Sequence, residues 1–200
     1  MTKVIVLNGQ GGVGKDTFKE FVKQYDKKKT GLDRIADTSM VDRVKAIAVL
    51  CGWKGQKENY DRRFLYELKQ LLSKYNDLPY QSVKRFIQTT FCAMLNDELI
   101  YPYIFVDARE VEDIERLVKD FNAITVLITN DKQLEYGNLA DDNIYNWSYD
   151  YVIENTSTLE NLQCAAETFW DEITKEERIL KSLAWENFNL NEIKIYAKSF

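Results

Sequence analysis

Residues 4–18 read VIVLNGQGGVGKDTF, and this stretch decides the fold. Its apolar beginning has the length of a strand that is buried on both faces. Four of the chain's eight glycines follow at once, and apolar residues then recur at helical spacing. Gly9, Gly14 and Lys15 fit the pattern G-x-x-x-x-G-K between a strand and a helix, which is the context that the pattern requires. The stretch therefore predicts a phosphate-binding loop.

The loop residues also indicate how a nucleotide would be held. Glycines let the backbone approach phosphate closely, and the N–H groups at the helix N-terminus favour an anion. We expect Lys15 to reach the β- and γ-phosphates and Thr17 to donate its hydroxyl to the α-phosphate. The alternative is a glycine-rich turn without a ligand. The loop residues expected to bind the nucleotide are Gly9, Gly11, Gly12, Val13, Gly14, Lys15, Asp16 and Thr17.

Asp16 departs from the usual pattern, which has Ser or Thr at this position with its hydroxyl on Mg²⁺. A carboxylate beside a triphosphate is repelled unless a divalent cation lies between them. Asp16 therefore either helps to hold the metal, directly or through water, or turns away from it. The departure favours Mg²⁺ as a cofactor, with ATP as the nucleotide.

The rest of the chain alternates between strand and helix patterns. We expect strands at 32–39, 101–108, 123–129 and 150–155, and helices at about 15–28, 40–52, 64–75, 83–98, 114–118 and 159–170. Strands separated by helices imply right-handed crossovers and a mostly parallel sheet. The predicted fold class is therefore α/β, a three-layer P-loop fold with five strands.

The predicted organisation is one domain over residues 1–174. It has a helical insert at about 40–100 that binds the acceptor and a short lid at about 130–149. Residues 175–200 are expected to be an extension packed on the same domain.

Composition excludes several classes of function. A net charge of −5 argues against binding to duplex nucleic acid. The chain has no histidine, and its three cysteines lie far apart, so a zinc site of the Cys/His type is not expected. We expect the cysteines to be buried free thiols. The first residues read as a strand rather than a signal peptide, and no apolar run has membrane length, so the expected location is the cytoplasm.

Three motifs carry a family resemblance. They are GKDT at 14–17, FVDAREVEDIE at 105–115 and DYVIENTSTLENL at 150–162. Together they resemble the bacteriophage-type deoxynucleoside monophosphate kinases and their bacterial relatives, over about residues 3–170. The resemblance implies the nucleoside-monophosphate-kinase version of the P-loop fold.

The resemblance also implies roles for individual residues. Asp107 would orient Mg²⁺ or its waters, so the expected metal ligands are Asp16 and Asp107. Arg109 would neutralise a transferring or acceptor phosphate, and Asn155 would border the donor adenine. The alternative for Asp107 and Arg109 is a structural ion pair at a strand end. Family members often carry a lid arginine, whereas the corresponding segment here offers Lys132, with Asp141 and Asp142 nearby.

The acceptor is expected between the second strand, the helices after it and the carboxyl edge of the sheet. A guanidinium can hold a phosphate with two parallel hydrogen bonds, although exposed Arg and Lys are often only a solvated helix face. Arg63 lies on the helical stripe of its family counterpart, so Lys15, Arg109 and Arg63 are the catalytic candidates. The candidate substrate-binding residues are Asp37, Ser39, Arg43, Lys45, Arg62, Arg63 and Arg85.

The leading hypothesis is ATP- and Mg²⁺-dependent phosphoryl transfer to a (deoxy)nucleoside monophosphate, giving the diphosphate. Such an acceptor is already ionised, so positioning and charge neutralisation suffice and no strong base is needed. One alternative is a small-metabolite kinase with a hydroxyl acceptor and Asp37 as base. Others are an ATP-dependent switch protein, in whose loop Gln10 would replace a signature lysine, and a kinase-like module that only binds nucleotide. The expected partner is a small nucleotide, without duplex nucleic acid or membrane, and the expected state is a monomer or homodimer.

Overall fold

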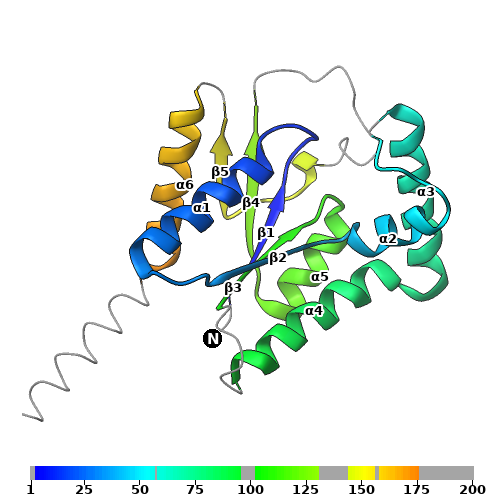
Figure 1. Cartoon of the computed structure of the whole chain (residues 1–200), viewed down its shortest axis with the longest axis horizontal. Coiled ribbons are helices and arrows are strands. Elements are labelled where there is room, and N and C mark those ends of the chain that lie inside the picture. The colour runs from blue at the N-terminus through cyan, green and yellow to red at the C-terminus, as the bar shows by residue number, and fades with distance from the viewer. Residues whose placement is uncertain (1–2, 57, 96–101, 131–143, 156–157, 176–200) are drawn as a thin grey trace, which may run out of the picture.

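A computed structural model describes residues 3–56, 58–95, 102–130, 144–155 and 158–175 (Figure 1). All five expected strands are present, and each expected helix is found with shifted ends. The strands are β1 (Lys3–Asn8), β2 (Ile35–Ser39), β3 (Tyr103–Asp107), β4 (Ile124–Thr129) and β5 (Tyr151–Glu154). The helices are α1 (Lys15–Thr30), α2 (Asp42–Leu50), α3 (Asn59–Asn76), α4 (Leu78–Leu95), α5 (Val111–Phe121) and α6 (Leu159–Ile173), with a 3₁₀ turn η1 (Ile144–Asn146).

The strands form one sheet in the order β2-β3-β1-β4-β5, and every pairing is parallel. The apolar strand β1 lies at the centre, where Ile5 is in register with Phe105 of β3 and Ile124 of β4. A central strand is covered on both faces, which explains its continuous apolar run. The predicted fold class, a three-layer α/β sheet of five parallel strands, is confirmed.

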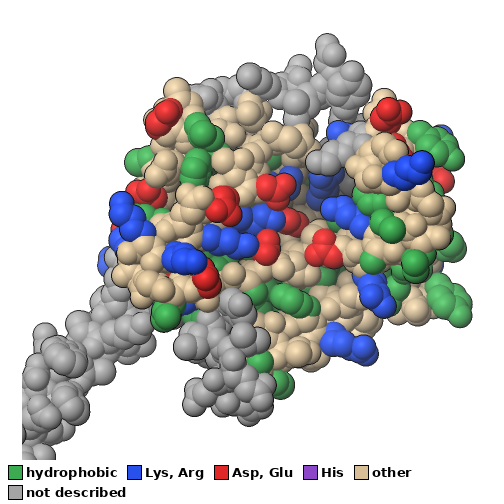
Figure 2. All heavy atoms as spheres, in the orientation of Figure 1, with side chains coloured by type: hydrophobic (Ala, Val, Ile, Leu, Met, Phe, Trp, Pro, Cys, Tyr) green, Lys and Arg blue, Asp and Glu red, His purple; other side chains and the backbone are tan. Residues whose placement is uncertain are grey.

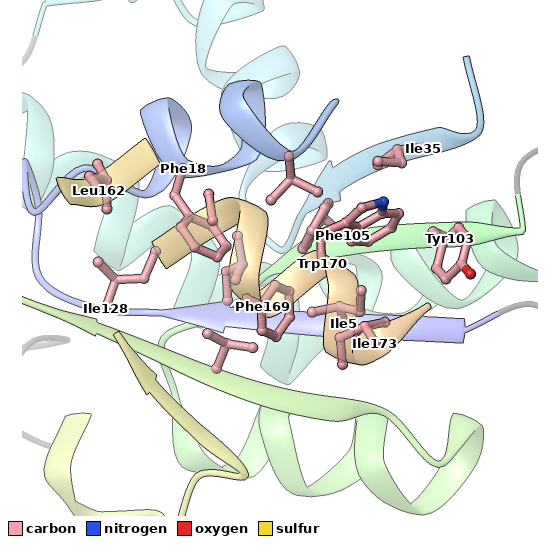
Figure 3. Packing of buried hydrophobic residues seen from close by; sticks show 14 of the residues in the cluster. Ile5, Phe18, Ile35, Tyr103, Phe105, Ile128, Leu162, Phe169, Trp170 and Ile173 are labelled. Carbon is pink, nitrogen blue, oxygen red and sulfur yellow. The ribbon is translucent and has the colours of Figure 1, made fainter. Parts of the chain in front are cut away.

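One face of the sheet packs against α1 and α6 (Figure 3). Ile5 and Leu7 of β1 point to this face and meet Phe18 of α1 and Phe169 of α6. The rings of Phe18 and Phe169 lie 5.5 Å apart between centroids. Each fully buried side chain of this size stabilises the fold by about 1.5–3 kcal/mol. This layer fixes α1, and with it the loop that precedes α1.

The far end of α1 is held by a buried charge pair. Asp26 is 2% exposed and accepts hydrogen bonds from Arg34 Nε at 3.0 Å and Arg34 Nη2 at 2.5 Å. Trp170 of α6 donates its indole N–H to the same carboxylate at 2.9 Å. A buried carboxylate is tolerated only when it is paired in this way. The contact joins α1, the start of β2 and α6.

The opposite face packs against α4 and α5 through Val4 and Val6 of β1. The residues that cover it are Tyr80, Val83 and Ile87 from α4 and Ile114 and Leu117 from α5. The segment at 40–100 was expected to be an acceptor-binding insert. It includes α4, which covers this face of the sheet, while α2 and α3 lie to the side (Figure 1). Of the expected lid, residues 131–143 lie outside the described residues, and so does the extension from residue 176 onward.

The three cysteines are exposed, so the prediction that they are buried was wrong. Cys164 shows the reason, because it lies two residues from both Leu162 and Ala166, which are buried on α6. Residues two apart on a helix point to nearly opposite sides. In the part of the chain that is described, no helix combines the length and apolar character needed to span a membrane.

Candidate functional site

The glycine loop follows β1 at the carboxyl edge of the sheet and leads directly into α1 (Figure 1). Gly9, Gly12 and Gly14 have φ values of 141°, 86° and 99°, which residues with a side chain rarely adopt. A Cβ on Gly9 would lie 2.4 Å from the carbonyl oxygen of Ile128 in β4. The loop therefore needs glycine both for its backbone angles and for its close approach to the neighbouring strand.

Lys15 reaches back over this loop from the first residue of α1. Its Nζ donates hydrogen bonds to the carbonyl oxygens of Gly9 at 2.6 Å and Gln10 at 2.8 Å. Gly14, the residue before the helix, provides no side-chain cap. The first N–H groups of a helix have no partner within the helix, and they carry partial positive charge. An ammonium group and helix N–H donors around a glycine loop fit the phosphates of a nucleotide.

Asn155 supports the loop from the end of β5. Its Nδ2 donates to the carbonyl oxygen of Val13 at 2.9 Å, and its backbone N–H donates to Thr129 of β4 at 2.8 Å. A Cβ on Gly14 would lie only 2.7 Å from Asn155 Nδ2. Asn155 thus contacts the loop backbone, and its expected place beside the adenine stays a prediction.

Asn8 joins the loop to the end of β3, a role that sequence analysis missed. It is fully buried and accepts the N–H of Gly9 at 2.7 Å. Its Nδ2 donates to the carbonyl oxygen of Arg109 at 3.2 Å and to the Tyr149 hydroxyl at 2.6 Å. The available signal was an amide at the end of an apolar strand, where a buried polar group needs partners.

Two guanidinium groups lie over the middle of the loop. Arg109 Nη2, which follows β3, and Arg62 Nη1, which comes from α3, each lie 3.8 Å from the position of a Cβ on Gly11. Arg63 instead bonds Glu67 one turn further along α3, at 2.8 Å, and its side chain is 77% exposed. Successive helix residues point about 100° apart. Helix α3 therefore brings Arg62 to the loop and turns Arg63 outward.

Lys69 fixes α3 beside the Arg109 segment. This lysine is 5% exposed, and its Nζ lies 2.7 Å from Asp113 Oδ2 and 2.9 Å from Glu110 Oε2. Lys69 and Arg62 are seven residues apart and so share one face of the helix. The ion pairs hold that face against α5 and position both arginines together.

The two expected metal ligands lie on either side of a lysine. Lys19 Nζ is 2.6 Å from Asp107 Oδ2 and 3.2 Å from Asp16 Oδ1. The side chain of Asp16 is 97% exposed, whereas Lys19 is buried. Burial raises the pKa of Asp107, and Lys19 offsets only part of this effect. Partial desolvation also raises the pKa of Asp16, but the nearby lysines outweigh it and the pKa is lowered overall.

The fit of this place to Mg²⁺ depends on Asp107. Its Oδ1 is buried and has no hydrogen-bond partner among the described residues, so it can accept a further ligand. No group of three or more metal-binding side chains converges within the same residues. Mg²⁺ is usually held by one or two carboxylates together with substrate phosphates. Asp107 and Asp16 therefore fit a magnesium ion that is shared with a nucleotide.

The remaining substrate candidates lie on β2, α2 and α4. Asp37 forms an ion pair with Lys23 at 3.0 Å. Ser39 is in register with Asp107, and its hydroxyl donates to the backbone carbonyl of Asp107 at 3.5 Å. The charge of Lys45 contributes to the lowered pKa of Asp16. Arg43 on α2 and Arg85 on α4 are exposed.

Figure 2 shows a hollow between the α1 side of the molecule and the α2–α3 side, with Lys and Arg side chains around it. The loop, its lysine and the parallel sheet define the class of protein. The chain is a three-layer α/β protein of the P-loop type.

No protein-family model and no curated protein matches the sequence. Among solved structures, thymidylate kinase from Ehrlichia chaffeensis is similar with a TM-score of 0.47 and 13% identity, over 84% of this chain and 98% of that one. A sugar kinase from Janibacter sp. is similar with a TM-score of 0.43 and 14% identity, over 86% of this chain and 95% of that one.

Proposed function

We propose that this protein is a kinase that transfers the γ-phosphoryl group of ATP to a (deoxy)nucleoside monophosphate. The observation that carries the proposal is the meeting of three cationic side chains at one phosphate loop. Lys15 comes from α1, Arg62 from α3 and Arg109 from the segment after β3. Phosphoryl transfer is catalysed mainly by positioning and by neutralising charge on the transferred group.

In this proposal, the three cations bind different parts of the two substrates. Lys15 and the loop N–H groups hold the donor phosphates, and Arg62 and Arg109 hold the transferring and acceptor phosphates. Mg²⁺, held by Asp107 and Asp16, would neutralise charge on the donor phosphates. The acceptor is a small nucleotide, and the protein acts in the cytoplasm as a monomer or homodimer without duplex nucleic acid.

A hydroxyl acceptor fits less well. Such an acceptor needs a carboxylate base, and Asp37 is the candidate on this edge of the sheet. Asp37 is already in an ion pair with Lys23. If Asp37 accepted a proton as a base, it would lose this ion pair. A phosphate acceptor does not need this step, because its oxygen is already ionised.

The neighbouring arginines of α3 give a matched test. We expect Arg62→Met to lower kcat/KM with the best monophosphate by about 100-fold or more, as for loss of a charged group at a transition state. We expect Arg63→Met to change it less than about threefold, because Arg63 points to solvent and exposed ion pairs contribute little. The measurement is a coupled assay across ribo- and deoxyribonucleoside monophosphates and a panel of hydroxyl acceptors.

Each outcome of this assay has a meaning. Absence of turnover with every monophosphate would overturn the proposal, and turnover with hydroxyl acceptors alone would replace it by a small-metabolite kinase. ATP binding without any transfer would favour a switch or a binding module. Equal losses in the two arginine variants would contradict the role given to Arg62.

A further inference from the structure

Lys19 is a buried cation that the proposed division of labour does not use. It lies one helical turn after Lys15 on α1, and it is 7% exposed. Its ammonium group contacts Asp16 from its own helix and Asp107 from the end of β3. The two residues that fit a magnesium ion therefore already share a positive charge from the chain itself.

The charges around Lys19 have a consequence for an incoming polyphosphate. Asp16 follows Lys15 directly in the sequence, and Asp107 is close enough to Lys15 for that lysine's charge to act on it. Without Lys19, the carboxylates of Asp16 and Asp107 would lie uncompensated beside the phosphate loop, and their charge would repel an anionic ligand. With Lys19, one of the two negative charges is neutralised.

We propose that Lys19 is a positioning residue that stands in for a divalent cation at Asp107, so that the loop can bind a nucleotide polyphosphate without Mg²⁺. Lys19 and Mg²⁺ then neutralise the same carboxylate. Lys19 therefore sets how strongly nucleotide affinity depends on Mg²⁺. This inference rests on the nucleotide binding in the proposed function, but it does not depend on the identity of the acceptor.

The test measures affinity rather than turnover. Isothermal titration calorimetry gives the Kd of ATP for each variant, once with excess EDTA and once with excess Mg²⁺. We expect Lys19→Met to weaken metal-free ATP by about tenfold or more, because the two carboxylates are then uncompensated. We expect its affinity for ATP with Mg²⁺ to fall less than about threefold, because the metal supplies the missing charge. In Lys19→Met, the ratio of the metal-free Kd to the Kd with Mg²⁺ should therefore rise above that of wild type.

Two further variants separate this charge effect from damage to the fold. The double variant Lys19→Met with Asp107→Asn removes the cation and its carboxylate together, and we expect metal-free affinity to return to within about threefold of wild type. Asp107→Asn alone leaves Lys19 in place, and we expect it to bind metal-free ATP at least as tightly as wild type. If Lys19→Met does not fold, weaker metal-free binding by Asp107→Asn alone still overturns the inference.

The matched control is Lys27→Met, on the same helix. Lys27 pairs with the exposed Asp33 at 3.0 Å, and we expect neither Kd to change by more than about twofold. If Lys19→Met weakens ATP equally with and without Mg²⁺, or if Asp107→Asn weakens metal-free ATP, the inference about Lys19 is wrong. If wild type binds ATP under neither condition, the proposed function itself fails.

Discussion

At the scale of single residues, the glycines of the loop differ in what they tolerate. Gly9 has a positive φ and a backbone oxygen of β4 in the place that a side chain would occupy. Gly11 lies in the same loop, yet the nearest atoms to an added Cβ are guanidinium nitrogens at 3.8 Å, which is an ordinary contact. The loop thus combines a position closed to side chains with one that is open.

The prediction at this scale compares these two glycines. We expect Gly9→Ala to destabilise the protein by roughly 2–4 kcal/mol, because the backbone of β4 cannot move without disturbing the sheet. We expect Gly11→Ala to change stability by less than about 1 kcal/mol. Urea unfolding followed by circular dichroism measures both. Equal stability of the two variants would show that the loop does not approach β4 as closely as described.

Sequence reasoning found the loop but not all of its neighbours. The glycine spacing and Lys15 were sufficient to predict the loop, because both are local features of the sequence. The sequence could not show which of Arg62 and Arg63 reaches the loop, because the two are adjacent on the helix and only the placement of α3 orients them. Lys19 was missed because its partner Asp107 comes from a distant strand, and only the folded sheet brings the two together.

At the scale of elements, the corner between α3 and α4 is fixed by a charge pair. Asp77 ends α3 with a φ of 56°, and it accepts a hydrogen bond from Arg116 of α5 at 2.9 Å. A second contact joins the other nitrogen and oxygen of the same pair. The Arg116 guanidinium also lies 3.5 Å from the ring centroid of Tyr80 in α4. One arginine therefore connects three helices.

This corner gives a prediction about pH. The hydrogen bond from Arg116 lowers the pKa of Asp77, so the pair stabilises the fold above the ordinary carboxyl pKa, and this contribution is lost as the pH falls through the lowered value. We expect Asp77→Asn to cost about 1 kcal/mol at pH 7, and the difference from wild type to shrink below about pH 4. Asn tolerates a positive φ, so the backbone is unaffected.

The measurement is urea unfolding of both proteins at pH 7 and at pH 3.5. Other carboxylates titrate in both proteins, so only the difference between them reports on Asp77. A difference that is the same at both pH values would contradict the assignment.

The ends of elements were harder to predict than their existence. The sequence YNDLPY was interpreted as a break, with the next helix beginning near Val83, but α4 begins at Leu78. Pro79 is compatible with this start because the first turn of a helix needs no N–H donors. The break is thus reduced to Asp77, which has a left-handed backbone conformation and whose carboxylate bonds Arg116 of α5.

At the scale of the whole molecule, Trp170 links the layers of the fold. It is 1% exposed, and its ring lies 4.5 Å from that of Tyr103 and 6.2 Å from that of Phe105. Its hydrogen bond to Asp26 joins α6 to α1 at the end of α1 away from the phosphate loop. The residue therefore contributes to stability at a distance from the site.

We expect Trp170→Phe to destabilise the protein by about 2–4 kcal/mol, through lost packing and one lost hydrogen bond to a buried carboxylate. ATP affinity should change less than about threefold, because the loop lies at the other end of α1. The control is Trp53→Phe. Trp53 donates an exposed hydrogen bond to the backbone carbonyl of Gln56, so this substitution should destabilise the protein by less than about 1 kcal/mol. Equal costs for the two tryptophans would contradict this account of the core.

The sequence predicted the layers of the molecule but not the order of the strands. Alternating strands and helices imply a parallel sheet, yet they do not say which strand is central. The buried Asp26–Arg34 pair was also not foreseen, because both residues appear in polar stretches and their burial depends on α6.

The central place of β1 has a consequence for how the chain is made. The strand leaves the ribosome before both of its neighbours, because β3 begins only at Tyr103 and β4 at Ile124. At typical rates of synthesis, this apolar strand waits roughly 5–20 s before either neighbour exists. The sheet should therefore close only when most of the domain has been translated.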